Sequence, residues 1–141
     1  MPNENELKQQ ISLYQKMLDI LRQLLGLQTQ LEKKQLEEMI LSIAKEEGVD
    51  GELLLATIKC ESGLNPRCIN KNPNGSTDFG LCQFNDVWYW QKEKVISPDD
   101  ALNKPEKAVR IMAKMFKKGR AKDWVCFSTK RYISFLSKKV G

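Results

Sequence analysis

The sequence predicts a mainly α-helical fold with one short β-hairpin or loop region and an N-terminal amphipathic helix. Apolar residues recur in steps of three and four over the first part of the chain, and Asp, Pro and Gly punctuate the remainder at positions typical of helix ends. One stretch, residues 65–76, is instead rich in Asn, Pro and Gly. At 141 residues the chain is long enough for one compact domain with an appendage.

A single amphipathic helix is predicted from about Glu4 to Lys34. Two sets of apolar residues repeat alternating steps of four and three: Leu7, Ile11, Tyr14, Leu18, Leu21 and Leu25, and then Leu13, Met17, Ile20, Leu24, Leu27 and Leu31. Such a wide apolar face must be covered by the domain itself, by another copy of the chain or by a partner helix. We therefore expect residues 1–35 to be a coiled-coil or docking segment and residues 36–141 to be the globular domain. The alternative is an ordinary helix packed on that domain.

Two further helices are predicted before the polar loop. One begins after Gln35 and runs to Glu47, where Gly48 offers a left-handed stop. Asp50 then caps a helix with an apolar run, which brings Glu61 to its C-terminal end.

The rest of the chain alternates loop and helix signals. Residues 65–76 are expected to be loop or short hairpin, and residues 79–84 are apolar and compact. Later helix starts are marked by Asp99, Asp100 and Pro105, and Gly119 ends the last helical run.

Composition narrows the class of protein. The chain is 41% hydrophobic and 29% charged, with a net charge of +5, as in an ordinary soluble protein that favours polyanions. The basic cluster Lys114, Lys117, Lys118, Arg120 and Lys122 is interpreted as a solvated face, because no nucleic-acid-reading motif accompanies it. No transmembrane span is expected, and the start MPNENELKQQ shows no secretory signal.

Histidine is absent, so Ser/His and Cys/His triads and most zinc hydrolases are disfavoured, and carboxylates must carry any acid–base chemistry. We expect no metal site and no cofactor. The four cysteines indicate either two disulfides in an oxidising compartment or four buried thiols. Three pairings are open from the sequence alone.

The segment from Gly48 to Trp90 carries the informative motifs. A helix ends in Glu-Ser-Gly at residues 61–63, Asn65 and Pro66 follow, and Gly-Leu-x-Gln stands at residues 80–83. In this order and spacing the chain strongly resembles the SLT-type lytic transglycosylases and their goose-type lysozyme relatives, over roughly residues 36–120. The resemblance implies a lysozyme-like domain that cleaves peptidoglycan glycan strands, with Gly-Leu-x-Gln as a strand-like element that closes the site.

Residues 75–80, Gly-Ser-Thr-Asp-Phe-Gly, also resemble the Gly-Ser-Thr-Asp-Tyr-Gly motif of c-type lysozymes, and the interval from Glu61 to Asp78 is the one that family uses. The resemblances imply that Glu61 and Asp78 are catalytic. They imply a substrate-binding set of Ser62, Asn72, Gln83, Asn85, Trp88, Tyr89 and Trp124, in which Trp88 and Tyr89 contact sugar rings and Trp124 packs on the catalytic glutamate.

The chemistry agrees with these roles. Cleaving a glycosidic bond needs a carboxylic acid that still holds its proton near neutral pH. Glu61 follows an apolar run and lies near the negative end of a helix dipole, and both effects raise a carboxyl pKa. Asp78, in a loop of Asn, Gly, Ser and Thr, is expected to be ionised and able to stabilise or attack an oxocarbenium-like centre.

Structural alternatives exist for each residue. Glu61 could be a surface residue in the last turn of its helix, and Asp78 a turn former. Of the three aromatic residues 88–90, at least one is expected in the core.

One disulfide pairing is a hypothesis based on where the cysteines stand relative to Glu61 and Trp124. Cys60 adjoins Glu61, and Cys126 follows Trp124 by two positions, so a Cys60–Cys126 disulfide would fasten the end of the catalytic helix to the segment that covers it. A Cys68–Cys82 disulfide would then brace the loop.

The leading functional interpretation is a muramidase of the lytic transglycosylase type, acting on the β-1,4 bond between N-acetylmuramic acid and N-acetylglucosamine. A hydrolytic lysozyme that uses Glu61 and Asp78 is the alternative, and a non-catalytic cell-wall-binding or assembly protein is a second class. We expect no nucleic-acid partner. Action is expected outside the cytoplasm, in the periplasm, cell wall or medium, or by phage delivery.

Overall fold

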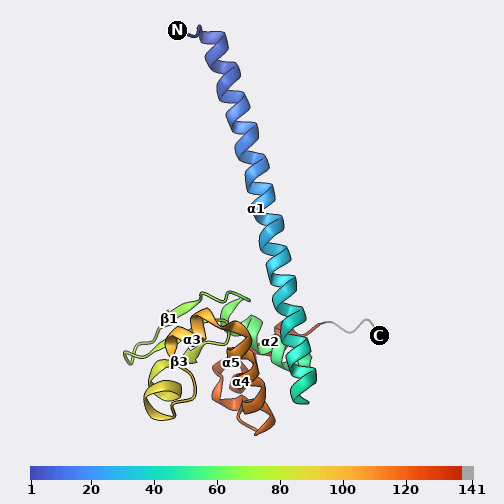
Figure 1. Ribbon diagram of the computed structural model, residues 1–141, viewed down its shortest axis with the longest axis vertical. Helices are drawn as coiled ribbons and strands as arrows, with labels where there is room; N and C mark the ends of the chain where they lie inside the picture. The colour runs from blue at the N-terminus through green and yellow to red at the C-terminus, as the bar shows by residue number, and fades with distance from the viewer. Residues whose placement is uncertain (138–141) are drawn as a thin grey trace. The chain divides into compact units, whose positions relative to one another are not determined.

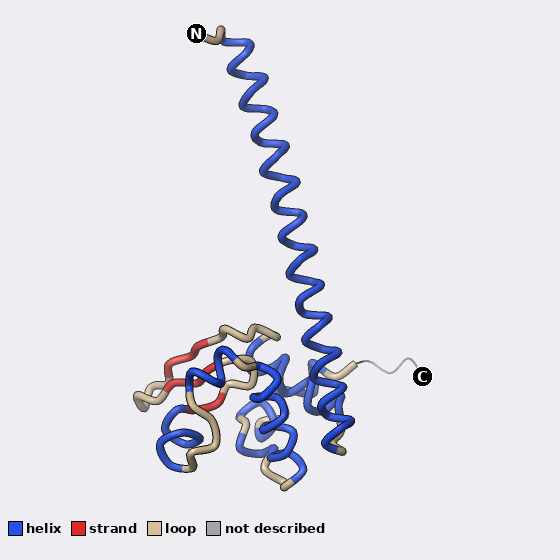
Figure 2. Tube along the Cα trace, in the orientation of Figure 1, coloured by secondary structure: helices blue, strands red, loops and turns tan. Residues whose placement is uncertain are grey.

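The structure is a computed structural model that describes residues 1–137, and the chain divides into two compact units, residues 1–35 and residues 36–141. The described part is mainly α-helical and contains one small antiparallel sheet (Figure 2). The predicted fold class is therefore confirmed.

Helix α1 (Glu4–Glu47) is continuous, so the prediction of separate helices before and after Gln35 is wrong. Residues 32–38 are Glu, Lys, Gln and Leu, all strong helix formers, and no Gly or Pro interrupts them. At the other end of α1 the chain leaves the helix at Gly48, whose φ of 72° confirms the left-handed stop.

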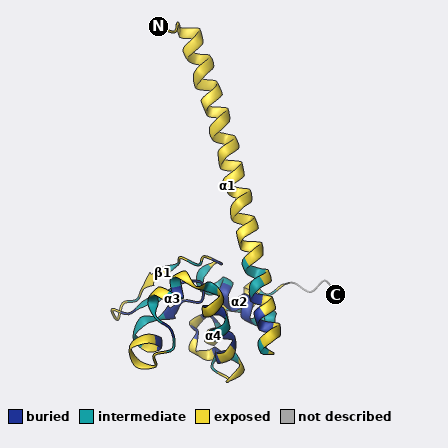
Figure 3. Ribbon diagram, in the orientation of Figure 1, coloured by how far each residue is buried: buried dark blue, intermediate teal, exposed yellow. Residues whose placement is uncertain are grey.

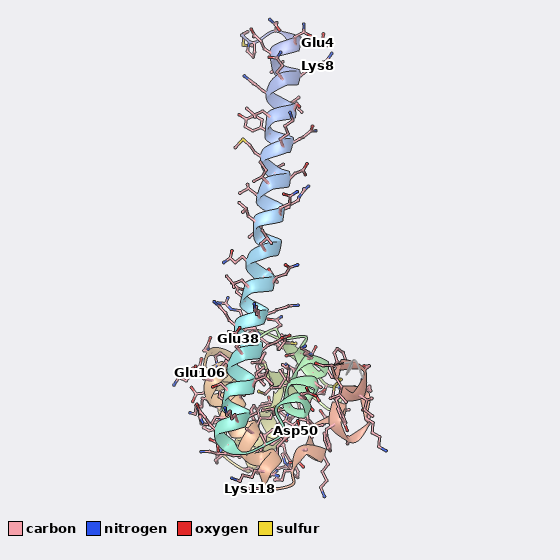
Figure 4. The ribbon with its side chains drawn as sticks, turned by 90° about the vertical axis from the view of Figure 1, so that its right-hand side faces the viewer. Glu4, Lys8, Glu38, Asp50, Glu106 and Lys118 are labelled. Atoms are coloured by element: carbon pink, nitrogen blue, oxygen red, sulfur yellow. A yellow bond between two sulfur atoms is a disulfide. The ribbon has the colours of Figure 1, made fainter. Side chains whose placement is uncertain are left out.

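Residues 1–35 form a helical unit whose residues are all exposed, as the colouring of Figure 3 shows. The Asn3 side chain accepts a hydrogen bond from the Glu6 backbone N–H at 2.9 Å, and the Glu6 carboxylate accepts one from the Asn3 N–H at 3.0 Å. This reciprocal capping box begins the helix. Glu4 and Lys8, labelled in Figure 4, form an ion pair at 2.7 Å one turn apart.

In the second unit, helix α2 (Gly51–Ser62) begins and ends as the sequence predicts. The Asp50 side chain accepts a hydrogen bond from the Leu53 N–H at 3.2 Å. Gly63 closes the helix at φ 63°, with its N–H donating to the Lys59 carbonyl. Glu61 consequently stands in the last turn.

A three-stranded sheet follows, in the order β1 (Ile69–Lys71), β2 (Thr77–Phe79) and β3 (Phe84–Asn85), all antiparallel (Figure 1). Its register places Asp78 opposite Asn70 on one side and Asn85 on the other. The polar stretch before Thr77 therefore forms a hairpin, as predicted.

The Gly-Leu-x-Gln motif is a turn between β2 and β3, and the expectation of a strand-like element is wrong. Gly80 and Gln83 have φ values of 82° and 54°, in the left-handed region that extended chain does not use. The Gln83 N–H and side-chain amide both donate to the Gly80 carbonyl, at 3.1 and 2.8 Å.

Short helices complete the unit: the π-helical η1 (Asp86–Lys92), α3 (Pro98–Asn103), α4 (Pro105–Lys117), η2 (Ala121–Asp123), α5 (Val125–Ser128) and η3 (Arg131–Phe135). Pro105 occupies the first turn of α4, and Asp99 and Asp100 lie in the first turn of α3, so these predicted helix starts are confirmed. Gly119, at φ 78°, follows the end of α4.

The core of this unit joins α1, α2, α4 and the turn after β2. Its largest fully buried side chains are Phe84, Ile40, Leu54, Ile58, Leu81, Met112 and Val109. A cluster of aromatic rings, Phe84, Tyr89 and Trp124, with centroids 5.1 to 5.7 Å apart, extends this core toward the sheet.

Two glycine substitutions test the turn. Gly80→Ala is expected to lower the free energy of unfolding by more than about 3 kcal/mol, because the new Cβ would meet the Ala101 carbonyl in addition to the strain of a positive φ. Gly75→Ala is the matched control: its φ is 87° but no atom lies within 4 Å of the Cβ, so a loss of about 1–2 kcal/mol is expected. Equal losses in urea unfolding of the two variants would contradict the close approach at Gly80.

Candidate active site

A cleft of about 650 Å³ lies in the second unit between the end of α2, the hairpin and the start of α5. Its lining residues are Glu61, Asn72, Pro73, Asn74, Ser76, Asp78, Gln83, Asn85, Trp88, Tyr89, Asp123, Trp124 and Val125. Both predicted catalytic residues and every predicted substrate-binding residue except Ser62 are brought together here.

Glu61 projects from the last turn of α2 and is half-buried. Burial raises the pKa of its carboxyl above the ordinary value, and the negative charge of Asp78 raises it further. Opposing these effects, the Cys126 backbone N–H donates a hydrogen bond to Glu61 Oε1 at 3.0 Å, and Arg131 contributes a positive charge. The net result is a carboxyl that holds its proton to higher pH than an exposed glutamate does.

A disulfide joins Cys60 to Cys126, as predicted. Cys60 precedes Glu61, and Cys126 supplies the N–H that Glu61 accepts, so the covalent bond and the hydrogen bond fasten α2 to α5 at the same place. The position of the glutamate therefore depends on two segments that are distant in the sequence.

The predicted Cys68–Cys82 disulfide is absent, and both cysteines are free. Cys82 is completely buried in the apolar core, whereas Cys68 lies at the edge of the sheet, where its sulfur accepts a hydrogen bond from Asn70 at 3.3 Å. Gln83 braces the two segments instead, since its amide donates to the Cys68 carbonyl at 3.0 Å and its oxygen accepts from Asn70 at 2.8 Å.

Asp78 is held by the neighbouring strand. The Asn85 amide donates to Asp78 Oδ1 at 2.8 Å and to Ser76 Oγ at 2.9 Å, while the Asn85 oxygen accepts the backbone N–H groups of Val87 and Trp88 at 3.1 Å. One amide therefore fixes the carboxylate, the hairpin and the start of η1 together.

Ser76 is a cleft residue that our sequence analysis missed. It is buried, it accepts hydrogen bonds from Asn72 at 3.1 Å and Asn85 at 2.9 Å, and its hydroxyl donates to Asn74 at 2.6 Å. Its place in the Gly-Ser-Thr-Asp motif was the available signal. The other lining residues that were missed are Pro73, Asn74, Asp123 and Val125.

The three consecutive aromatic residues separate. Trp88 lines the cleft and is 47% exposed, with Lys92 Nζ 4.9 Å from its ring centroid. Tyr89 is buried and stacks on Trp124, which confirms that at least one of the three belongs to the core. Trp90 is exposed and does not line the cleft.

Trp124 forms an apolar wall of the cleft. The residue is 3% exposed, and its Nε1–H donates to the Cys82 carbonyl at 2.8 Å. Because its one polar group is satisfied inside the protein, the indole contributes only apolar surface to the site.

Ser62 does not reach the cleft. Its hydroxyl donates to the Ile58 carbonyl at 3.2 Å, one turn back along α2.

Among the described residues, no group of three or more His, Cys, Asp or Glu is placed to hold a metal ion. No described helix is long and apolar enough to cross a membrane.

The burial of Glu61 predicts a pH-dependent stability difference for Glu61→Gln. Since the carboxyl pKa is raised on folding, ionisation costs the folded state stability as pH rises from 4.5, the ordinary value, through the raised one. Gln cannot ionise, so the variant is expected to gain stability over the parent at neutral pH, relative to the difference between them below pH 4.5. Urea unfolding across this range measures it, and a gap that does not change with pH would contradict it.

Removing the disulfide is expected to lower stability and loosen Glu61. The bond closes a 66-residue separation, so Cys60→Ser with Cys126→Ser is expected to cost about 4 kcal/mol of unfolding free energy. A weaker hydrogen bond from Cys126 also raises the Glu61 pKa further, which NMR titration of the carboxyl carbon reports. Cys68→Ser is the control, because that cysteine is free. An equal loss in the control variant would argue against the disulfide.

Comparison with known proteins identifies the family to which the chain belongs. No curated protein matches the chain. The family described as transglycosylase SLT domain matches residues 38–123, more than half of the chain, and the matched region includes Glu61, the hairpin and the Gly-Leu-x-Gln turn. The chain therefore belongs to the SLT transglycosylase domain family, with its lysozyme-like, mainly α-helical fold.

Proposed function

We propose that this protein cleaves the β-1,4 bond between N-acetylmuramic acid and N-acetylglucosamine in peptidoglycan by transglycosylation, with Glu61 as the proton donor. Family membership supports a peptidoglycan substrate and glycosidic-bond cleavage. The observation that carries the assignment of Glu61 is its half-buried carboxyl of raised pKa on the wall of an open cleft. A cell-wall substrate implies action outside the cytoplasm.

In the first step Glu61 gives its proton to the glycosidic oxygen as the bond from that oxygen to C1 of the muramic acid breaks. The leaving sugar keeps the electron pair of that bond and departs with a new hydroxyl. The Cys126 N–H then stabilises the Glu61 carboxylate, since it donates to Oε1 of that group at 3.0 Å.

In the second step the carboxylate of Glu61 removes the proton of the muramic acid's own 6-hydroxyl as that oxygen attacks C1. The product is a 1,6-anhydro end, and no water is consumed. Proton balance is complete, because Glu61 regains the proton that it gave up.

Asp78 supports this reaction by its charge. Positive charge develops at C1 as the glycosidic bond breaks, and a carboxylate in the same cleft stabilises it. Its negative charge also raises the pKa of Glu61, which favours the protonated donor. The hydrolytic alternative gives Asp78 a larger part, as nucleophile or stabiliser while water completes the reaction.

The remaining cleft residues are proposed to bind the glycan. The half-exposed Trp88 offers a ring face for sugar stacking, and Asn72 offers an amide group. The amide of Asn85 already makes four hydrogen bonds within the protein, so Asn85 is proposed to shape the cleft by holding Asp78 in place. Gln83, Tyr89 and Trp124 are buried and shape the cleft from below. Ser62 is proposed only as a helix-end residue.

Clearing of purified cell walls tests the assignment of Glu61. Glu61→Gln is expected to abolish clearing, a loss of at least about 100-fold, because Gln cannot donate the proton. The matched control is Glu52→Gln, the same substitution at the exposed start of the same helix, which is expected to clear walls normally. Unchanged clearing by Glu61→Gln would overturn the assignment of Glu61 as the proton donor, whereas a parent protein that does not clear walls would favour the non-catalytic wall-binding alternative.

Mass spectrometry of the released muropeptides separates the two enzymatic routes. Anhydro ends are expected, and they are lighter than reducing ends by one water. Asp78→Asn is expected to slow clearing while the products stay anhydro. Reducing ends from the parent protein would establish the hydrolytic alternative.

A further inference from the structure

The helical unit of residues 1–35 presents two apolar seams. Seam one is Leu7, Ile11, Tyr14, Leu18, Leu21 and Leu25, and seam two is Leu13, Met17, Ile20, Leu24, Leu27 and Leu31. Each of these side chains is between 45% and 63% exposed. An apolar surface of this length is a mark of an interaction site.

The angle between the seams indicates how many neighbours they need. With about 100° between successive residues of a helix, the centres of the two seams lie about 100–120° apart around the axis. A two-stranded coiled coil covers only one such seam. A helix with two seams packs against two neighbours, and a closed ring of roughly four to six helices gives corner angles of about 90–120°.

The charges of this segment favour a second copy of the same chain as the neighbour. Neither seam carries a charge, and the segment from Glu4 to Leu31 holds three acidic and three basic residues. Four of these charged residues form ion pairs within the helix, Glu4 with Lys8 and Asp19 with Arg22. Copies therefore do not repel one another, and the basic polar face that favours an anionic membrane is missing.

The available area is sufficient for a stable assembly. A large aliphatic side chain removes roughly 60–120 Å² from water when it is buried, so the twelve side chains offer on the order of 1,000 Å² per copy. Stable interfaces bury about 800 Å² per partner. A lone helix is also only marginally stable in water, and Gly26 weakens this one by a further ~1 kcal/mol.

We propose that copies of this chain assemble through seams one and two into a parallel or antiparallel bundle of about four to six helices. Such an assembly would present several clefts to one polymeric substrate and raise the apparent affinity through multivalency. This benefit rests on the proposed function, whereas the assembly itself does not.

Light scattering of the full chain after size-exclusion chromatography tests the proposal. The expected mass is roughly four to six times the 16.3 kDa of one chain. Leu18→Glu with Leu21→Glu interrupts seam one, and Ile20→Glu with Leu24→Glu interrupts seam two. Each pair alone is expected to reduce the mass to that of a monomer or dimer. Gln23→Glu with Gln30→Glu adds the same charge on the polar face and is expected to keep the parental mass.

Two controls separate loss of assembly from loss of folding and from loss of catalysis. The three tryptophans all lie in residues 36–141, so their fluorescence reports whether the globular unit of each seam variant is folded. Glu61→Gln is expected to assemble like the parent, which keeps failure of this proposal distinct from failure of the proposed catalysis. A monomeric parent chain overturns the proposal, whether or not it binds lipid vesicles. The proposal is also overturned if the parent chain is a dimer and the variant with Ile20→Glu and Leu24→Glu remains a dimer.

Discussion

The hydrogen bond from the Cys126 N–H to Glu61 is the interaction on which the site depends. An acid catalyst must lose its proton during the reaction and recover it afterwards, so neither form can be strongly disfavoured. Burial favours the protonated form of Glu61, and the single backbone donor favours the carboxylate. Burial alone would raise the pKa of Glu61 further, and additional hydrogen-bond donors to its carboxylate would lower it.

This balance needs both partners at fixed positions, and two different devices supply them. On one side of the cleft the Cys60–Cys126 disulfide ties α2 to α5. On the other side, the hairpin that carries Asp78 is tied by amide hydrogen bonds from Gln83 and Asn85. Amide networks resist displacement only while every polar atom has a partner, and no described buried side-chain nitrogen or oxygen lacks one.

Local rules predicted much of this arrangement. Both ends of α2 could be placed, because Asp50 has the chemistry of an N-terminal cap and Gly63 that of a C-terminal cap, and Glu61 stands just before Gly63. The donor from Cys126 could not be placed, because it lies 65 residues from Glu61 and depends on packing. Likewise, residues 80–83 were expected to be strand-like but form a turn, in which Gln83 has a positive φ. This conformation could not be predicted, because non-glycine residues seldom adopt it.

The two units differ in the burial of their apolar side chains, although helix α1 runs through both. In residues 36–47 of α1, apolar side chains such as Ile40 and Ile43 are buried within the globular unit, whereas those of residues 7–31 are exposed. A sequence pattern indicates only that an apolar side chain favours burial. The globular unit buries the apolar side chains of residues 36–47 but not those of residues 7–31. The polar run of residues 32–35 separates the two groups without breaking the helix, because Glu, Lys and Gln favour helix as strongly as Leu does. A boundary between two compact units therefore need not be a boundary in secondary structure.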